Sequence, residues 1–392
     1  YGYRAILAWG KLAYPSQPPI RHDVTMTQPP IRIAVILPLS GAEALFGQQS
    51  LQGAHMAATE INAAGGVLGG HPIHLEVHDE ATKLDRAVAL TRAAVDSGVF
   101  AILGPTSSNH RDAMLPICAE AGVPLLYATD YEGGACSRYL FCYSPIPDHY
   151  LAPMVDALAQ HSADFAMVGA DYVWPRTIGL RLGEALAARG LRLVHEEYVP
   201  LNANDIAAVA KRALQSGAGA LVMALLGSDG QEFIRVWAQS PADQRPQLAV
   251  IAFNENYMAG LTSEQSEGII TVLPFLSEVD LPETRSFVAR QRAMFGPDTV
   301  VSYFAESHYG LLMFLREAFA QAGTDDRERV IDAMGDRTLT IGHGPVTMRA
   351  ADHHMILNMF LAQAHNGQLV ARKDLGPITP SNQCAQTTAA QD

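Results

Sequence analysis

The sequence predicts an α/β protein built from two doubly wound, Rossmann-like lobes. Short apolar runs alternate with longer amphipathic segments, which is the pattern of βαβ units around a parallel sheet. The alternation stops at Pro145 and Pro147 and then begins again. The chain has 392 residues, more than one hydrophobic core normally holds. Together these observations favour two lobes of similar size.

The first lobe is expected to begin with a strand at residues 31–37, whose continuous apolar character is typical of a strand buried on both faces. The next segment, 47–63, places Leu51, Ala54, Ala58 and Ile61 at helical spacing. The glycines at 65–70 then end that helix, because glycine tolerates the positive φ found at helix ends. The same alternation predicts strands at 73–77, 101–103 and 124–126, and helices at 86–95 and 112–121.

The second lobe repeats the pattern. Its predicted strands are 165–168, 192–194, 220–223 and 248–251, and its helices are 176–189, 206–215 and 231–238. A later helical block, 282–295 and 301–321, is expected to return to the first lobe, and strand signals at 345–347 and 355–361 to close the sheets. The predicted organisation is therefore an extension outside the core (1–28), lobe 1 (29–146, completed by about 277–348), lobe 2 (147–276, completed by about 349–375) and a polar tail (376–392).

The composition is that of a globular protein, with 48% hydrophobic and 17% charged residues. A net charge of −13 argues against direct nucleic-acid binding, which needs a basic surface. No window approaches the roughly 18 consecutive apolar residues of a membrane span. The first 25 residues do not have the pattern of an export signal, and Met26 precedes a good strand. These features favour a native start near Met26 and a cytoplasmic protein, with a periplasmic one as the alternative.

Four cysteines do not form a disulfide framework in a chain of this length. The favoured interpretation is four reduced thiols, although Cys136 and Cys142 are near enough in sequence to pair.

Three patterns that could indicate chemistry have simpler explanations. The glycines at 65–70 follow a helix and precede a strand, the reverse of a phosphate-binding loop, so no nucleotide cofactor is expected. His74, Glu76 and His78 alternate along one strand, but a solvated strand face explains them better than a metal site. Cys118, the candidate nucleophile of an amide hydrolase, lies among apolar residues in a helix and fits a small buried hydrophobe. We therefore expect no catalytic residue, no cofactor and no metal.

Polar and aromatic residues gather where strands of both lobes end. In an open parallel sheet, ligands bind outside the carboxyl ends of the strands. Hydroxyl residues at 106–108 and the run Tyr127 to Gly133 follow two neighbouring strands of the first lobe. Asp171 to Arg176 follows a strand of the second lobe and opens its helix with Pro175. Facing strand ends of this kind predict a small-molecule pocket between the lobes.

These motifs resemble those of a known family. Leu103-Gly104 with Ser108 and Met114-Leu115-Pro116, Tyr127-x-Thr129-x-Tyr131-Glu132-Gly133, and Gly169-x-Asp171-Tyr172-x-Trp174-Pro175-Arg176 are similar to those of type I periplasmic-binding-protein receptors. The resemblance runs from about 31 to about 370 and includes 61–70. It is greatest to the branch that contains the amide receptor of the aliphatic amidase operon and the binding proteins of urea and short-chain amide transporters.

The resemblance implies two lobes joined by three crossovers that close on a ligand, and a receptor rather than an enzyme. By position, Ser108 and Thr129 would hydrogen-bond the polar end of the ligand, and Tyr127, Tyr172 and Trp174 would enclose it. Thr106 stands where the amide receptor has an aromatic residue and Asp130 where it has proline, so a larger amide, urea or an amine-bearing ligand is expected rather than acetamide. Ser228 and Glu255, at strand ends of the second lobe, complete the predicted site.

The branch implies two biological roles. In the favoured one, the protein is a cytoplasmic amide sensor that restrains an RNA-binding antiterminator, and a homodimer is compatible with it. In the alternative, it is the periplasmic binding protein of an ABC transporter for urea, short-chain amides or branched-chain amino acids, with a permease as partner.

Overall fold

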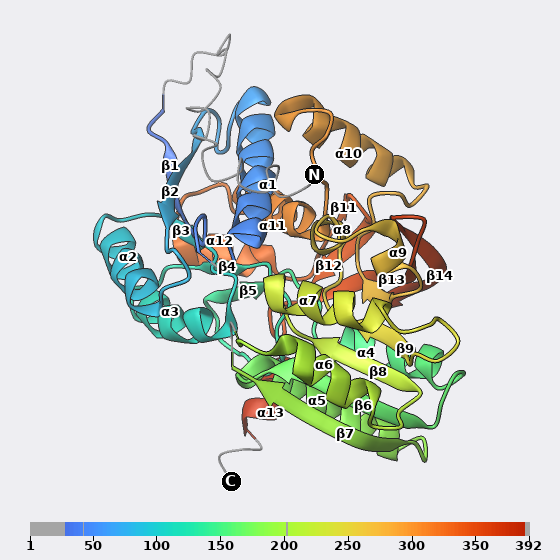
Figure 1. Ribbon diagram of the computed structural model, residues 1–392. Coiled ribbons are helices and arrows are strands. Elements are labelled where there is room, and N and C mark those ends of the chain that lie inside the picture. Colours follow the sequence, from blue (N-terminus) through green and yellow to red (C-terminus); the bar gives the residue numbers. More distant parts are fainter. Residues whose placement is uncertain (1–27, 42, 201–202, 389–392) are drawn as a thin grey trace.

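The computed structural model describes residues 28–41, 43–200 and 203–388, which form two α/β lobes (Figure 1). The predicted extension at 1–28, apart from Gln28, and the last four residues of the predicted tail lie outside the described residues. The predicted fold class is confirmed: each lobe has a sheet with a parallel core, and helices alternate with its strands along the chain.

The first lobe contains a five-stranded parallel sheet of order β2-β1-β3-β4-β5. Alternate residues of β1 serve opposite faces: Ile33 and Val35 pack toward α1, and Ala34 and Ile36 toward α2 and α3. This two-sided burial explains the continuous apolar run of the strand. The elements are β1 (Ile31–Leu37), α1 (Ala44–Ala63), β2 (Ile73–Asp79), α2 (Leu84–Asp96), β3 (Ala101–Leu103), α3 (Ser108–Glu120), β4 (Leu125–Tyr127) and β5 (Leu140–Cys142).

The second lobe contains a larger sheet of order β11-β12-β13-β10-β9-β8-β6-β7, with β14 also paired to β13. Strands β6 to β10 are parallel, and β11 to β14 add an antiparallel edge. The strands are β6 (Asp164–Ala170), β7 (Arg192–Val199), β8 (Ala220–Ala224), β9 (Gln247–Val250), β10 (Ile270–Leu273), β11 (Arg337–Ile341), β12 (Gly344–Met348), β13 (Met355–His365) and β14 (Gln368–Ile378). The helices are α4 (Pro147–Leu158), α5 (Val173–Ala187), α6 (Ile206–Leu214), α7 (Gly227–Ala238), α8 (Glu255–Met258) and α9 (Ser263–Ser266).

The segment expected to complete the first lobe, about 277–348, is divided between the lobes. Helices α10 (Pro282–Phe295) and α11 (Tyr303–Ala322) pack against α1, and α12 (Arg327–Met334) packs against α11. Strands β11 and β12 instead join the second sheet, where Met348 pairs with Met355 of β13. The expected boundary at 348/349 therefore falls in the turn between two paired antiparallel strands.

The prediction of four reduced cysteines is wrong. Cys136, in the loop between β4 and β5, forms a disulfide with Cys384, 248 residues later. Cys118 and Cys142 are free and buried, so the Cys136–Cys142 pairing left open by their spacing does not form. Cys384 was not identified from the sequence as the partner of Cys136, because Cys384 lies in the segment expected to be a polar tail.

That segment is structured. Strand β14 extends to Ile378, and the chain then forms α13 (Gln383–Thr388), in which the Gln383 side chain is buried. Within the described residues, no helix combines the length and the hydrophobicity that crossing a membrane requires.

Candidate ligand-binding site

The ends of β3 and β4 hold the predicted hydroxyl residues of the first lobe. Tyr127 is fully buried, and its hydroxyl donates to the backbone oxygen of Thr106 at 3.0 Å. The hydroxyls of Thr106 and Ser107 both donate to the carboxylate of Glu43, next to the start of α1. Ser107 precedes α3 but does not cap it with its side chain. The Thr106 hydroxyl therefore already has a partner within the protein, and its predicted contact with a ligand stays a prediction.

Ser108 belongs to a buried polar network beneath the site. Its hydroxyl donates to Oε2 of Glu132 at 2.7 Å, and Oε1 of the same carboxylate accepts from Nη2 of Arg111 at 2.7 Å. The Arg111 guanidinium lies 4.3 Å from the ring centroid of Tyr131 and 5.2 Å from that of Tyr127. A charge this deeply buried needs such pairing. The network fixes the loop after β4 against α3.

Asp130 has a different environment, although it is adjacent to Tyr131. The residue is 8% exposed, and Oδ2 accepts a hydrogen bond from the hydroxyl of Tyr303, the first residue of α11. Its other oxygen, Oδ1, is buried and has no partner, and neither has the hydroxyl of Thr129. Burial raises the pKa of Asp130 to about 7, because the ionised form is poorly solvated.

The second lobe brings aromatic side chains to the same place. The rings of Tyr172 and Trp174, at the start of α5, are stacked with centroids 6.2 Å apart. Trp174 is 3% exposed and its Nε1 has no partner. The hydroxyl of Tyr150, on α4, lies near this nitrogen without hydrogen-bond geometry and is also unpartnered.

Asn254 completes this side of the site. Its Oδ1 caps α8 by accepting from the backbone nitrogens of Asn256 and Tyr257, at 3.0 and 3.1 Å. The capping bonds fix the orientation of the amide, and Nδ2 is left buried without a partner. The Tyr303 hydroxyl is bonded to Asp130, and it lies near Tyr150 and near the Asn254 side chain without hydrogen-bond geometry to Nδ2. Residues of both lobes therefore meet around this phenol.

These side chains form what we call the cleft cluster, a group of buried polar atoms from both lobes that lack partners. Leaving one such group unsatisfied costs about 1–3 kcal/mol. Native proteins rarely keep several together unless a ligand or water satisfies them. The cleft cluster consists of Thr129 Oγ1, Asp130 Oδ1, Tyr150 OH, Trp174 Nε1 and Asn254 Nδ2.

Tyr150 and Asn254 are absent from the sequence-based prediction. Asn254 follows β9 just as Thr129 follows β4, so the strand-end rule could have identified it. Tyr150 lies in the first turn of α4, directly after a crossover between the lobes, and no motif marks it.

Two predicted residues lie apart from the cleft cluster. Ser228 is exposed in the first turn of α7. Glu255 accepts a hydrogen bond from the backbone nitrogen of Ser277 at 2.7 Å, and burial raises its pKa to about 7. It lines a separate cavity of about 340 Å³ whose other walls include Met258 and Val301. A second cavity, of about 570 Å³, lies near Ile31 and Phe100, at the opposite ends of the strands.

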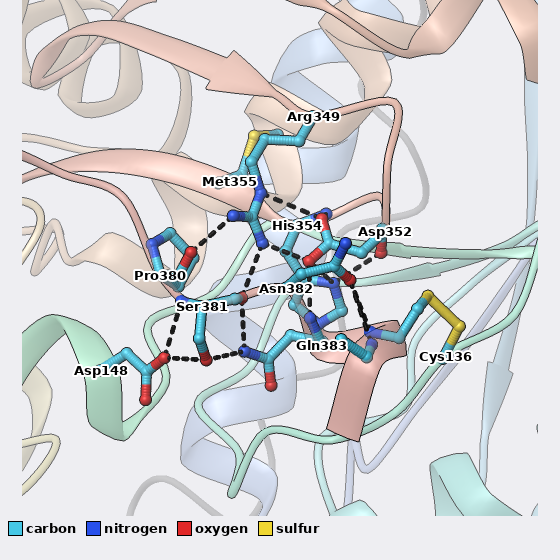
Figure 2. Close-up of polar contacts among 12 residues, drawn as sticks. Cys136, Asp148, Arg349, Asp352, His354, Met355, Pro380, Ser381, Asn382 and Gln383 are labelled. Atoms are coloured by element: carbon cyan, nitrogen blue, oxygen red, sulfur yellow. Dashed lines mark hydrogen bonds and ion pairs between the residues drawn. A yellow bond between two sulfur atoms is a disulfide. The ribbon is translucent and has the colours of Figure 1, made fainter. Parts of the chain in front are cut away.

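A strap formed by residues 377–384 joins the loop after β4 of the first lobe to α4 of the second (Figure 2). Gly134 donates its backbone N–H to the side chain of Gln383 at 2.7 Å, and the disulfide from Cys136 follows. On the second lobe, Asp148 of α4 accepts from both the backbone nitrogen and the hydroxyl of Ser381.

A second set of contacts holds the strap from the other side. Arg349 pairs with Asp352, and Asp352 in turn accepts from the Gln383 backbone nitrogen at 2.9 Å (Figure 2). Arg349 also donates to the backbone oxygens of Pro380 and Ser381. The loop that carries Thr129 and Asp130 is therefore tied both to the strap and to the chain between β12 and β13.

The geometry does not support the residues that were considered as a nucleophile or as metal ligands in those roles. Cys118 is fully buried, and burial raises the pKa of its thiol to about 12, which contradicts a role as nucleophile. Glu76 pairs with Arg32 of the neighbouring strand instead of joining His74 and His78. Among the described residues, no group of three or more histidine, cysteine, aspartate or glutamate side chains could hold a metal ion.

Comparison with known proteins identifies the family. Residues 30–368 match the family model described as periplasmic binding protein. The chain belongs to the periplasmic binding protein family. Members of this family are ligand-binding proteins and are typically not enzymes.

Curated relatives carry names of amino-acid-binding proteins. The "Leu/Ile/Val-binding protein homolog 8" of Brucella abortus (strain 2308) is 25% identical over 248 residues, 60% of each chain. The match thus spans about three fifths of that relative's length. The "Leucine-, isoleucine-, valine-, threonine-, and alanine-binding protein" of Pseudomonas aeruginosa is 22% identical over 319 residues, 80% of this chain and 84% of the relative.

Solved structures share the fold. A solute-binding protein of an R. palustris ABC transporter, in complex with benzoate, has 20% identity and a TM-score of 0.78, covering 90% of this chain and 97% of its own. A branched-chain amino acid transporter substrate-binding protein from Streptococcus pneumoniae, in complex with isoleucine, has 20% identity and a TM-score of 0.79, covering 89% and 100%. The amide-receptor branch suggested by the motifs is not distinguished by these matches.

Proposed function

We propose that this protein is the binding protein of an ABC importer and that it holds a small polar ligand between its lobes. The cleft cluster is the observation that carries the proposal. Five buried polar atoms without partners, contributed by both lobes, are what a ligand enclosed by lobe closure would satisfy. Closure on a ligand is favourable because the ligand replaces the water that these groups lose.

The transport role is favoured over the amide sensor that the sequence first suggested. The relatives are named as amino-acid-binding and transporter solute-binding proteins. In addition, disulfides persist in oxidising compartments and are rare in the bacterial cytosol, so the Cys136–Cys384 pair supports a periplasmic location. An antiterminator partner has no comparable support.

A short amide, urea or an amino acid each offers the donors and acceptors that the cleft cluster lacks. Thermal unfolding with acetamide, butyramide, urea and leucine would test the receptor role, because a ligand that binds only the folded state raises the melting temperature with concentration. Stabilisation by one of these compounds, without turnover, is expected. A melting temperature that none of the four compounds raises would contradict this ligand class.

Fractionation of the native cells, with thiol alkylation of each fraction, would test the location. The periplasmic fraction is expected to contain the protein with two alkylatable thiols, Cys118 and Cys142, after denaturation. A cytoplasmic protein with four alkylatable thiols would contradict the transport role.

A further inference from the structure

With Asp130 ionised, the cleft cluster contains one group that can only accept hydrogen bonds and two that can only donate them. Asp130 accepts through Oδ1 when it is ionised, whereas Trp174 Nε1 and Asn254 Nδ2 are donors. The hydroxyls of Thr129 and Tyr150 can do either. A matching ligand therefore presents an N–H or O–H group to Asp130 and a carbonyl-type oxygen to the donors.

The charge around Asp130 is also one-sided. The buried cation of the first lobe, Arg111, is paired with Glu132 and packs on the rings of Tyr127 and Tyr131, which belong to the core between the sheet and α2–α3. Asp130 faces the other way, toward Tyr303 at the start of α11. The contacts of Arg111 therefore lie on the far side of the loop and provide no neutralisation for a second carboxylate beside Asp130.

We propose that Asp130 selects the ligand by its charge: the cleft accepts neutral carboxamides and cationic amidines or amines, and rejects monocarboxylates. This inference rests on the proposed receptor function and names the ligand class of the same site. Above the pKa of Asp130, a carboxylate at this position would place two like charges in a buried environment, which is strongly unfavourable. Zwitterionic amino acids remain in the accepted class when their ammonium group reaches Asp130.

Matched compounds that differ in charge but not in shape provide the test. Two series serve: acetamide, acetamidine and acetate, and benzamide, benzamidine and benzoate, each titrated calorimetrically against the full chain at pH 8, where Asp130 is mostly ionised. We expect binding of the amide or the amidine of at least one series, and at least 100-fold weaker binding of the corresponding carboxylate. In Asp130→Asn, the amidine should lose about 10- to 150-fold in affinity, as expected for a hydrogen bond to a charged group, and discrimination against the carboxylate should fall.

Two further variants keep the test decisive. Asp96→Asn, at an exposed position at the end of α2, changes the same charge elsewhere and should leave all affinities unchanged. Tyr303→Phe keeps the Asp130 carboxylate but removes the hydroxyl bonded to it. Selectivity against carboxylates should therefore persist in Tyr303→Phe, and this result can be measured even if Asp130→Asn does not fold.

The possible failures are distinguishable. If acetate or benzoate binds wild type as tightly as the amide or the amidine, the charge selection is wrong while the receptor function stands. If none of the six compounds binds, the proposed ligand class is wrong, and the receptor function is then judged from leucine and from any ligand that co-purifies.

Discussion

Asp130 should make the ligand-free protein less stable than it would be with a neutral side chain. Its pKa rises from 3.8 to about 7 on folding, because the carboxyl is buried and only one of its oxygens is hydrogen-bonded. Below about pH 3 the carboxyl is largely protonated in both states. As the pH rises toward 7, the unfolded chain releases its proton while the folded chain keeps it, so the free energy of unfolding falls through this window.

The size of the effect follows from the pKa. One pKa unit corresponds to 1.36 kcal/mol, so the full rise would cost about 4 kcal/mol above pH 7. Water that enters the cleft reduces this cost, and about 1–4 kcal/mol is expected. Asp130→Asn removes the titrating group and should therefore increase the free energy of unfolding by this amount at pH 8, and by little at pH 4.

Urea denaturation of both proteins between pH 4 and pH 8, without ligand, measures the difference directly. The exposed variant Asp96→Asn serves as control and should show no such pH-dependent difference. With a bound amidine the order should reverse, because the ligand stabilises the ionised carboxylate in wild type only. An Asp130→Asn protein that is less stable than wild type at pH 8 without ligand would refute the reasoning.

Three other predictions follow from the packing, the strap and the cleft. Cys384→Ser opens a loop of 248 residues and should lower the free energy of unfolding by about 2–5 kcal/mol in urea; a midpoint equal to that of the oxidised wild type would contradict the role of the strap. Trp174→Phe keeps a ring but removes the unpartnered N–H, so calorimetry should show about 5- to 10-fold weaker ligand binding with little change in the melting temperature of the free protein. Unchanged affinity would remove Trp174 from the site. Gly53→Ala would place a Cβ 1.9 Å from the backbone oxygen of Ala305, where α1 meets α11, and should cost at least about 1–3 kcal/mol. Gly183→Ala, in α5 with nothing within 4 Å, should instead stabilise by up to about 1 kcal/mol, and equal effects of the two glycine variants would contradict the packing.

Hydrophobic periodicity predicted the lobes and most elements correctly because it reflects burial, which is a local property of each segment. The run at 31–37 is buried on both faces, and the spacing of Leu51 and Ile61 marks the buried face of α1. The strand-end rule likewise led to Thr129, Asp130 and Trp174, which each carry a buried polar atom without a partner, and their contact with a ligand stays a prediction.

The failures concern contacts between residues far apart in the chain. Cys136 and Cys384 are joined only because the segment after β13 and β14 returns to the loop between β4 and β5, and no local pattern shows this path. Similarly, β11 and β12 pair in the second sheet although they follow helices of the first lobe. Ser228 and Glu255 lie at the strand ends, as predicted, but a strand end alone does not determine whether a side chain turns toward the cleft.

Native mass spectrometry of the protein purified from its own cells would test the central claim most directly. Wild type should carry one small molecule that is lost on denaturation, and Asp130→Asn should carry it at much lower occupancy. A wild-type protein that carries no ligand and gains none from the amide, amidine and amino-acid compounds would contradict the receptor function. Equal occupancy in wild type and Asp130→Asn would contradict the role of Asp130 in the cleft.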